Sequence, residues 1–355
     1  MQCVSLFSGC GGLDLGLRRA GFRIVLGCDN DARCAQSHEV NFPETSFHHG
    51  SITDFVRALR DGEITVPEEV DLVAGGPPCP PYSKSRFYRK DKPRALEDEV
   101  GFETLNGYLE TVRLLNPRAF LLENVPGFAY KVHRDALDHL VATADHLGYT
   151  CNWQIVNAAD HGVPQIRERF ILVATRVGEF SFPEPTHAKE PQHDLLSATR
   201  EAWRTAGDAL ADLDTAENET DEGHFAGGQF HDLLCEVPPG DNYLYFTAKR
   251  GYPKPVFEWR SRYWSFLLKL SPEMPSWTIQ ARRSNNMGPF HWRNRILRIE
   301  EVKRLQTFPD DWFLAGTVEQ QWRQVGNAVP PLLAERLGSA LREYLSQSEP
   351  LTLAA

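Results

Sequence analysis

The sequence contains no uninterrupted apolar run of about 18 residues, which is the length that a membrane-spanning helix needs. Its first residues, MQCVSLFSGCGG, lack a basic region followed by an apolar stretch, so we expect no secretory signal. The seven cysteines include no CxxC pair, which is typical of a reduced intracellular protein without a disulfide framework or a zinc site. We therefore expect a cytoplasmic chain, at the nucleoid if bacterial, that needs no metal.

An excess of basic residues is also missing, because 48 acidic residues outnumber 38 basic ones and give a net charge of −10. That value would argue against nucleic-acid binding if the charge were spread evenly, but binding requires only a local basic face. Acidic residues crowd into 190–236, whereas 241–295 carries ten basic and only three acidic residues. The charge distribution therefore allows a DNA-binding surface in 241–295.

Short apolar runs alternate with helix-like segments over the first half of the chain. We expect strands at 2–7, 22–27, 71–74, 119–122, 149–157 and 169–175, and helices at 13–20, 32–41, 105–115 and 133–147. This alternation predicts an α/β fold with a mostly parallel, doubly wound sheet. With 355 residues, the chain is long enough for such a domain and a smaller second one.

The pattern changes near Phe182, where a run of prolines suggests a domain boundary. Beyond it we expect a helix at 194–213, an acidic loop at 214–242 and an irregular aromatic and basic region at 243–292. Regular structure returns at 300–306. We expect the last helix, at 331–345, to pack back onto the first domain, which would make that domain discontinuous.

A glycine-rich segment, FSGCGGL at 7–13, follows the first predicted strand and opens the first predicted helix. Glycines there let the backbone turn tightly and let a nucleotide-like ligand approach closely. Asp29 ends the second predicted strand, where ribose hydroxyls would need an acceptor. The spacing is neither GxGxxG nor a phosphate-loop GK[ST], and a tight turn that binds no ligand would look the same.

A proline-rich segment, GGPPCPPYS at 75–83, lies just beyond the strand predicted at 71–74. Its four prolines fix the backbone and hold the thiol of Cys79 at the carboxyl edge of the sheet, where open α/β proteins have their sites. Cysteines more often pack in a core, but these flanking prolines make that interpretation unattractive. The basic residues that could favour a thiolate are Lys84, Arg86, Arg89 and Lys90. Cys10 is the one rival nucleophile, because it lies in the glycine-rich turn.

Polar residues follow two further strands. Glu123 ends the strand at 119–122, so its carboxyl group should lie beside Cys79, and partial burial would raise its pKa enough to hold a proton. Arg167 and Arg169 stand two residues apart, which puts both side chains on one side of an extended chain. Alone, each signal would be an ordinary charged strand end.

The order of the segments is more specific than any one of them. The glycine-rich turn, Pro-Pro-Cys, Glu-Asn-Val and Gln-x-Arg-x-Arg are followed by RIL at 295–297, RLQTFP at 304–309 and GNAVP at 326–330. This series closely resembles the ordered motifs of the DNA (cytosine-5)-methyltransferase family, in particular its bacterial type II modification enzymes. The resemblance covers most of 2–182 and 293–340, and 185–290 matches only as a variable target-recognition region.

The resemblance implies an S-adenosylmethionine-dependent enzyme with a Rossmann-like catalytic domain formed by 1–184 and 322–346. A smaller target-recognition domain with a hinge would comprise 185–321. We expect 241–290 to be its DNA-reading surface, with Arg282 and Arg283 as the best candidates for readers and most aromatic residues in its own core. The implied partners are double-stranded DNA and a cognate restriction endonuclease acting on the same site, and we expect a monomer.

The resemblance also assigns roles to residues. Phe7 would stack on the cofactor adenine and Asp29 would take the ribose hydroxyls. The implied cofactor-binding residues are Phe7, Gly9, Gly11, Gly12, Leu13, Asp29, Asn30, Ile52, Gly76, Pro78, Asn327 and Ala328. Cys79 would attack C6 of cytosine, Glu123 would protonate N3, Arg169 would donate to O2, and Arg167 would brace Glu123 and the loop. Because C6 is inaccessible within a stacked duplex, the cytosine must be flipped out.

Three positions depart from the family pattern. Pro80 replaces the glutamine that usually follows the cysteine, which puts the DNA contacts of that loop in doubt. Ser51 replaces an aspartate that commonly meets the adenine amino group, and Asn30 replaces a stacking aromatic found in some members. The last two departures bear on cofactor affinity rather than on its identity.

Three other functions fit less well. A tRNA cytosine methylase should have a shortened recognition region with a Cys-Phe-Thr signature, and the sequence has neither. A catalytically silent DNA-binding relative should have lost the cysteine or Glu-Asn-Val, and both are present. A nicotinamide oxidoreductase leaves Pro-Pro-Cys and Gln-x-Arg-x-Arg unexplained.

Overall fold

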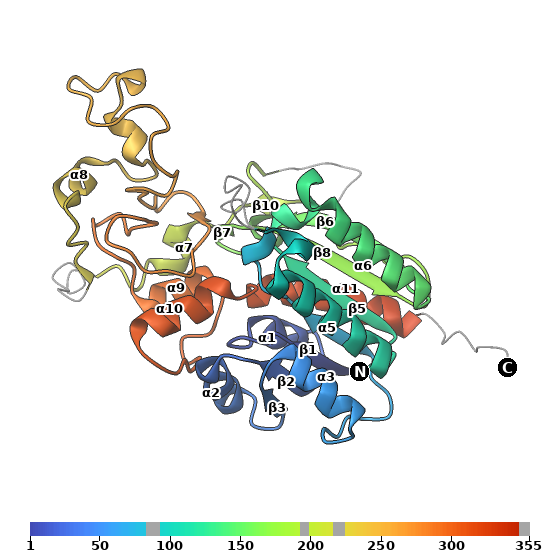
Figure 1. The fold of residues 1–355 in the computed structure, drawn as a ribbon. Helices are drawn as coiled ribbons and strands as arrows, with labels where there is room; N and C mark the ends of the chain where they lie inside the picture. The colour runs from blue at the N-terminus through green and yellow to red at the C-terminus, as the bar shows by residue number, and fades with distance from the viewer. Residues whose placement is uncertain (83–92, 192–198, 216–223, 348–355) are drawn as a thin grey trace.

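A seven-stranded sheet, in the order β3-β2-β1-β4-β5-β8-β6, forms the centre of the larger lobe. The computed structural model describes residues 1–82, 93–191, 199–215 and 224–347 (Figure 1). The first five strands run parallel, and β8 is antiparallel to both neighbours. The strands are β1 (Gln2–Leu6), β2 (Arg23–Asp29), β3 (Ser46–His49), β4 (Leu72–Gly75), β5 (Ala119–Asn124), β6 (Thr150–Asn157) and β8 (Glu168–Thr175). The predicted α/β fold with a mostly parallel sheet is confirmed.

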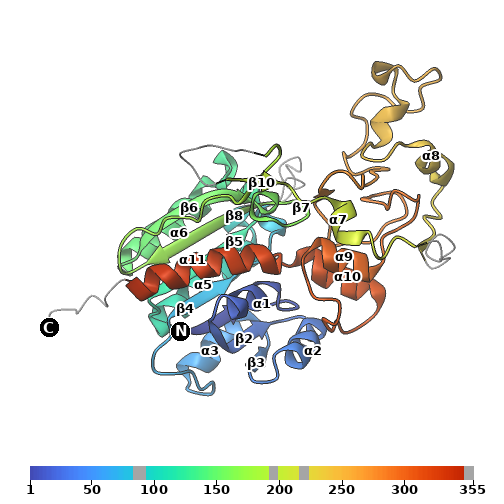
Figure 2. The same cartoon turned by 180° about the vertical axis from the view of Figure 1, so that it is seen from behind.

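One face of the sheet is covered by α1 (Gly12–Arg19) and α11 (Pro331–Gln347) (Figure 2). The two helices pack closely, since a Cβ added to Gly16 would lie 2.3 Å from the Cβ of Ala334. Because α11 ends the described chain and α1 is its first helix, the C-terminal segment returns to the N-terminal domain. The last helix thus lies against α1, the first helix of the larger lobe.

The other face is covered by α3 (Ile52–Arg60), α5 (Glu99–Leu115) and α6 (Arg134–His146), while α2 (Ala32–Asn41) lies beside β3 (Figure 1). The buried hydroxyl of Tyr108 on α5 donates to the carbonyl oxygens of Leu121 at 2.7 Å and Val73 at 3.2 Å. The sequence pattern did not predict β3, because this four-residue edge strand is only partly buried and reads Ser-Phe-His-His.

The second lobe contains only short elements within the described ranges. They are β9 (His187–Ala188), β10 (Glu201–Ala202), α7 (Ala206–Leu210), α8 (His231–Glu236) and β11 (Ser276–Trp277), followed by α9 (Ile299–Leu305) and α10 (Val318–Asn327) at the junction. The predicted helix at 194–213 is wrong for 199–205, because only Ala206–Leu210 of the range is helical, and 192–198 lie outside the described residues. Pairing with β9 keeps β10 extended, and a capping box between Thr205 and Asp208 starts α7 only at Ala206.

The two lobes are joined by backbone pairing and by a shared core. In β11, Ser276 and Trp277 pair with Gln165 and Ile166, which form β7 directly before β8. The Trp312 indole donates to the carbonyl of Cys10 at 3.1 Å, so the chain after α9 already contacts the turn before α1. None of the helices within the described ranges is long and apolar enough to cross a membrane.

Candidate active site

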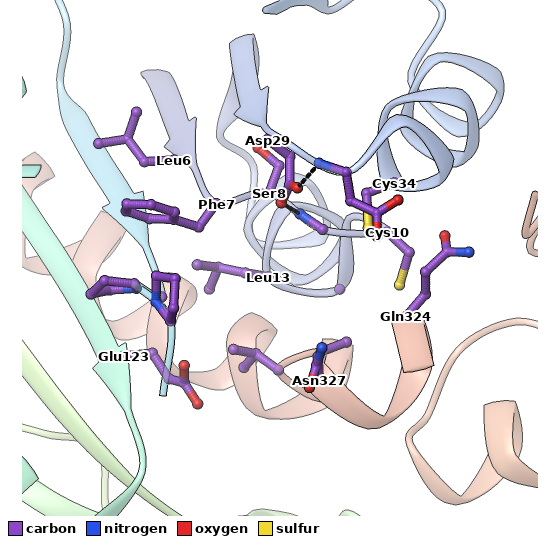
Figure 3. Close-up of a pocket in the computed structure, with 18 of the residues that line it drawn as sticks. Leu6, Phe7, Ser8, Cys10, Leu13, Asp29, Cys34, Glu123, Gln324 and Asn327 are labelled. Carbon is purple, nitrogen blue, oxygen red and sulfur yellow. Dashed lines mark hydrogen bonds between the residues drawn. The ribbon is translucent and has the colours of Figure 1, made fainter. Parts of the chain in front are cut away.

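A cavity of about 350 Å³ lies where β1, β2, β4 and β5 end. This volume falls in the range of small-molecule sites. Figure 3 shows Phe7, Asp29 and Glu123 around it, with Asn327 supplied by the C-terminal part of the chain. The predicted cofactor residues that line it are Phe7, Gly9, Gly12, Leu13, Asp29, Asn30, Gly76, Pro78, Asn327 and Ala328. Cys79 and Glu123 line the same cavity.

Left-handed backbone shapes the turn between β1 and α1. Phe7, Gly9 and Gly11 have φ values of 54°, 55° and 84°. Gly11 does not line the cavity, but a Cβ there would lie 2.5 Å from the ring of Phe42. A Cβ on Gly12 would lie 2.5 Å from the carbonyl oxygen of Val329, because the C-terminal loop packs on this turn. The glycines thus permit both the turn and the close approach of that loop.

Asp29 fixes the glycine-rich turn to the end of β2. Its Oδ2 accepts from the backbone N–H of Gly9 at 2.8 Å, and its Oδ1 accepts from that of Asp31 at 2.8 Å. Burial raises the pKa of this carboxyl group, although both N–H donors oppose the shift. Each oxygen keeps a second lone pair, so the group can still accept from ribose hydroxyls.

Acidic groups outnumber basic ones around the cavity. Asp29, Asp31 and Glu123 line it, and Arg323 is the single cationic side chain among the described lining residues. Arg323 is paired with Asp31 at 2.9 Å. This balance fits a ligand that carries cationic groups, as S-adenosylmethionine does through its sulfonium and ammonium groups.

Ile52, like Gly11, is a predicted cofactor residue that does not line the cavity. It begins α3 and is buried in the core, where a Cβ on Gly107 would lie 2.6 Å from its side chain. Ser51 caps the same helix and donates to Asp54 Oδ2 at 2.7 Å. The cofactor contact expected of Ile52 therefore stays a prediction.

The thiol of Cys79 stands in a loop that is fixed on both sides. Tyr82 N donates to Cys79 O at 3.0 Å in the short 3₁₀ helix Pro80–Tyr82, and Asn124 Nδ2 donates to Pro77 O at 3.1 Å. Burial and then the Glu123 carboxyl group raise the pKa of Cys79 to about 11, and two arginines oppose them.

Among the described residues, the effect of burial on the pKa of Cys79 is larger than the opposing effect of the two arginines. Cys79 is therefore a thiol at neutral pH, and the described residues do not favour the expected thiolate. Lys84, Arg86, Arg89 and Lys90, which were expected to help, lie outside the described residues. The rival Cys10 also lines the cavity and is 1% exposed. Burial raises its pKa far above the usual range, so it is the poorer nucleophile.

Glu123 lies beside Cys79, as predicted, because β4 and β5 are neighbours in the sheet. It is 4% exposed, and burial raises its pKa although Arg169 and Arg167 lower it. Its Oε1 lies 2.8 Å from Nε of Arg169. Glu123 therefore has the raised pKa that a proton donor needs, and Arg169 holds it in place.

Arg167 has other partners than those expected. Its guanidinium is fully buried and donates to three carbonyl oxygens: Ile279 O at 3.1 Å, Gly326 O at 2.8 Å and Ala328 O at 2.9 Å. Among the described residues it is Arg169 that makes the direct contact with Glu123, and Arg167 acts on Glu123 only through its charge. Arg167 instead ties the segment after β11 to the C-terminal loop of the cavity, and no sequence spacing reveals such distant partners.

Comparison with known proteins agrees with this geometry. The family described as C-5 cytosine-specific DNA methylase matches residues 1–343. The chain belongs to this family. It is a DNA (cytosine-5)-methyltransferase, and the family uses S-adenosylmethionine as its methyl donor.

Relatives resemble this methyltransferase along nearly their whole length. Type II methyltransferase M.SacI of Streptomyces achromogenes is 36% identical, over 97% of this chain and 93% of its own. M.MthTI of Methanothermobacter thermautotrophicus is 31% identical, over 97% and 98% respectively. A prophage-encoded E. coli protein described as a DNA modification methyltransferase has a similar structure, with a TM-score of 0.68, 20% identity and coverage of 98% of this chain and 100% of its own.

The methyltransferase cavity also contains residues that the sequence pattern did not single out. Arg323 and Gln324 line it from α10, and Cys34 lines it from α2. Arg323 precedes Asn327 by four residues on α10, so both side chains lie on one face of that helix. The four-residue spacing of Arg323 and Asn327 is visible in the sequence. It indicates a shared face only if 318–327 is already known to be a helix.

Proposed function

We propose that this chain methylates C5 of one cytosine within a specific double-stranded DNA sequence, through a covalent bond between Cys79 and C6. Cys79 and Glu123 line the same cavity, and Arg169 lies 2.8 Å from Glu123; this arrangement carries the proposal. Bound S-adenosylmethionine would supply the electrophilic methyl group. The cavity lining, with three acids and one arginine, supports its binding there.

The side chains divide the chemistry between them. The sulfur of Cys79 bonds to C6 as its proton leaves, and Glu123 donates a proton to N3, so the ring does not accumulate negative charge. Arg169 holds Glu123 and has further N–H groups to offer to O2. C5 then takes the methyl group, a base removes the C5 proton, and the C6–sulfur bond breaks to restore the free cysteine while N3 returns its proton to the Glu123 carboxylate.

DNA recognition is the proposed role of the second lobe. We keep 1–184 and 322–346 as the catalytic domain and 185–321 as the recognition domain with its hinge. The exposed side chain of Arg282 supports its assignment as a DNA reader, while Arg283 is half-buried and already has partners. The relatives named as type II methyltransferases support a cognate restriction endonuclease. We further propose that the chain acts as a monomer.

Bisulfite sequencing of DNA from cells that express the chain tests this function and finds its target. Wild-type protein should protect one cytosine within one short sequence from conversion. A strain that expresses Cys79→Ala at the same level should give full conversion, because the bond to C6 cannot form. Protection by the Cys79→Ala variant, or no protection by wild-type protein, would refute the proposal.

A further inference from the structure

A carboxyl group lies buried behind the glycine-rich turn. Asp14 on α1 and its partner His38 on α2 are both 0% exposed. Asp14 Oδ2 lies 2.7 Å from Nε2 of His38, and Asp14 Oδ1 accepts from the hydroxyl of Ser5. A buried charge pair adds little net stability, because apolar residues of similar volume would serve a core at least as well. This carboxyl group therefore suggests a role beyond packing.

The surroundings of His38 favour its neutral form. Its ring packs on those of Phe42 and Phe47, with centroids 4.5 Å and 4.8 Å away. Its Nδ1 is buried and has no hydrogen-bond partner within the described ranges. A protonated ring would bury an N–H there without an acceptor, whereas the neutral ring leaves only an unused lone pair. With Nε2–H donating to Asp14, the pair carries one negative charge.

Two serines connect this charge to the cavity. Ser5 and Ser8 both line it, and Figure 3 shows Ser8 beside Asp29. Ser8 Oγ lies 3.0 Å from the Oγ of Ser5, which donates to Asp14. Burial raises the pKa of Cys10 in the cavity wall, and the charges of Asp14 and Asp29 raise it further. The negative potential of Asp14 therefore reaches the cavity.

Two acids of the cavity lining are matched by arginines, which Asp14 is not. Asp31 pairs with Arg323 at 2.9 Å, and Glu123 pairs with Arg169 at 2.8 Å. Among the described residues, Asp14 forms an ion pair with no lysine or arginine. Its charge thus remains uncompensated beside a cavity that is expected to hold a positively charged cofactor.

The methyl donor and its product differ at one atom that a charge can distinguish. S-adenosylmethionine has a positively charged sulfonium, whereas the sulfur of S-adenosylhomocysteine is neutral. Contacts to the adenine, the ribose and the amino-acid groups serve both molecules equally. A buried charge acts over several ångströms in the protein interior, where salt screens it far less than at the surface.

We propose that the buried carboxylate of Asp14 makes the cavity prefer the charged methyl donor over the uncharged product. Asp14 acts through the protein interior rather than by contact, and His38 and Ser5 hold it in place. The proposal rests on the proposed function, because it concerns the cofactor expected in this cavity. Such a preference would weaken product binding relative to donor binding and so limit inhibition by the product.

Isothermal titration calorimetry without DNA tests the proposal by measuring the Kd of each molecule separately. Asp14→Asn keeps the shape of the side chain and can donate to Nε2 of His38, whose own proton then moves to Nδ1. The Kd for S-adenosylmethionine should rise about 5- to 20-fold relative to that for S-adenosylhomocysteine, because one nearby charge is lost. The wild-type ratio of the two Kd values should change little between low and high salt.

Three matched variants separate the charge from other effects. Phe7→Ala should weaken both molecules alike, because they share the adenine on which Phe7 is proposed to stack. Asp61→Asn removes an exposed acid at the end of α3 and should change neither Kd. His38→Gln keeps a donor to Asp14 and should keep the wild-type ratio. If Asp14→Asn does not fold, Asp14→Leu with His38→Leu removes the charge together with its partner, and the same shift is expected.

The proposal fails if the Asp14 variant weakens both molecules equally, which would be a purely structural effect, or if it changes neither Kd. It also fails if His38→Gln increases the preference for S-adenosylmethionine, because His38 would then be charged and the wild-type pair neutral. Failure of the proposed function would look different, since the wild-type chain would then bind neither molecule.

Discussion

Replacing Arg167 by methionine should loosen the junction between the lobes. Its guanidinium donates to Ile279 O, Gly326 O and Ala328 O within a fully buried site. Each buried acceptor left unpaired costs about 1–3 kcal/mol, so three such bonds set a range of about 3–9 kcal/mol. Ala328 O keeps a second donor, Gln306 Nε2 at 3.4 Å, and removing a buried cation relieves its desolvation cost. We therefore expect the free energy of unfolding to fall by about 3–5 kcal/mol.

Urea unfolding measures the loss, and amide hydrogen exchange locates it. The backbone of 276–281 and of 325–330 should exchange faster in Arg167→Met, whereas β1 and β4 should keep their protection. Arg167→Lys is the control, because it keeps the charge but has one ammonium group in place of a planar fork. It should recover part of the stability and part of the protection.

Unchanged protection in both segments, with an unfolding free energy within about 1 kcal/mol of the parent, would contradict this assignment. If such a variant also lost methyl transfer, Arg167 would act in the chemistry, as its motif had suggested. The two outcomes are separable because the assay of stability needs neither cofactor nor DNA.

Three further predictions follow from the cavity. Glu123→Gln should lower the single-turnover rate of methyl transfer about 10²- to 10⁴-fold, because it removes the proton donor, and should leave cofactor affinity nearly unchanged. A rate within about threefold of the parent would contradict the role of Glu123 as the acid. Because the pKa of Cys79 is about 11, its thiolate fraction should rise about tenfold per pH unit from pH 7 to 10, and its rate of alkylation by iodoacetamide should rise with it. A rate of alkylation that levels off near pH 9 would show a thiol of ordinary pKa and would contradict this prediction. Phe7→Ala should weaken S-adenosylhomocysteine binding about 10- to 100-fold in calorimetry, because a ring at the cavity wall is lost, whereas Phe102→Ala, on the exposed start of α5, should not.

Much of the larger lobe could be predicted from the sequence because its signals are local. The strands of the sheet are short apolar runs, and β5 is buried along its whole length, as a central strand must be. Glu123 was predicted to lie beside Cys79, and Asp29 was placed at the end of another strand; parallel strands end at one edge of the sheet, so all three residues line one cavity. Topology alone therefore assembles most of the cavity.

The rest depends on contacts between distant parts of the chain. The partners of Arg167 come from residues more than 100 positions away, and nothing in Gln-x-Arg-x-Arg distinguishes its role from that of Arg169. The raised pKa of Cys79 reflects burial, which a count of nearby basic residues in the sequence does not capture. In the second lobe, pairing with β9 keeps Glu201 and Ala202 extended within the helical pattern predicted at 194–213, and the periodicity of the sequence does not show such pairing.

Covalent capture tests the central claim, that Cys79 is the nucleophile in this cavity. A duplex with 5-fluorocytosine at the target position should form an SDS-resistant adduct with the wild-type chain and S-adenosylmethionine, because fluorine at C5 blocks the last elimination. Peptide mass spectrometry should place the modified cytosine on Cys79, and Cys79→Ala should form no adduct while still binding cofactor. An adduct on Cys10, or one that persists in Cys79→Ala, would contradict the account.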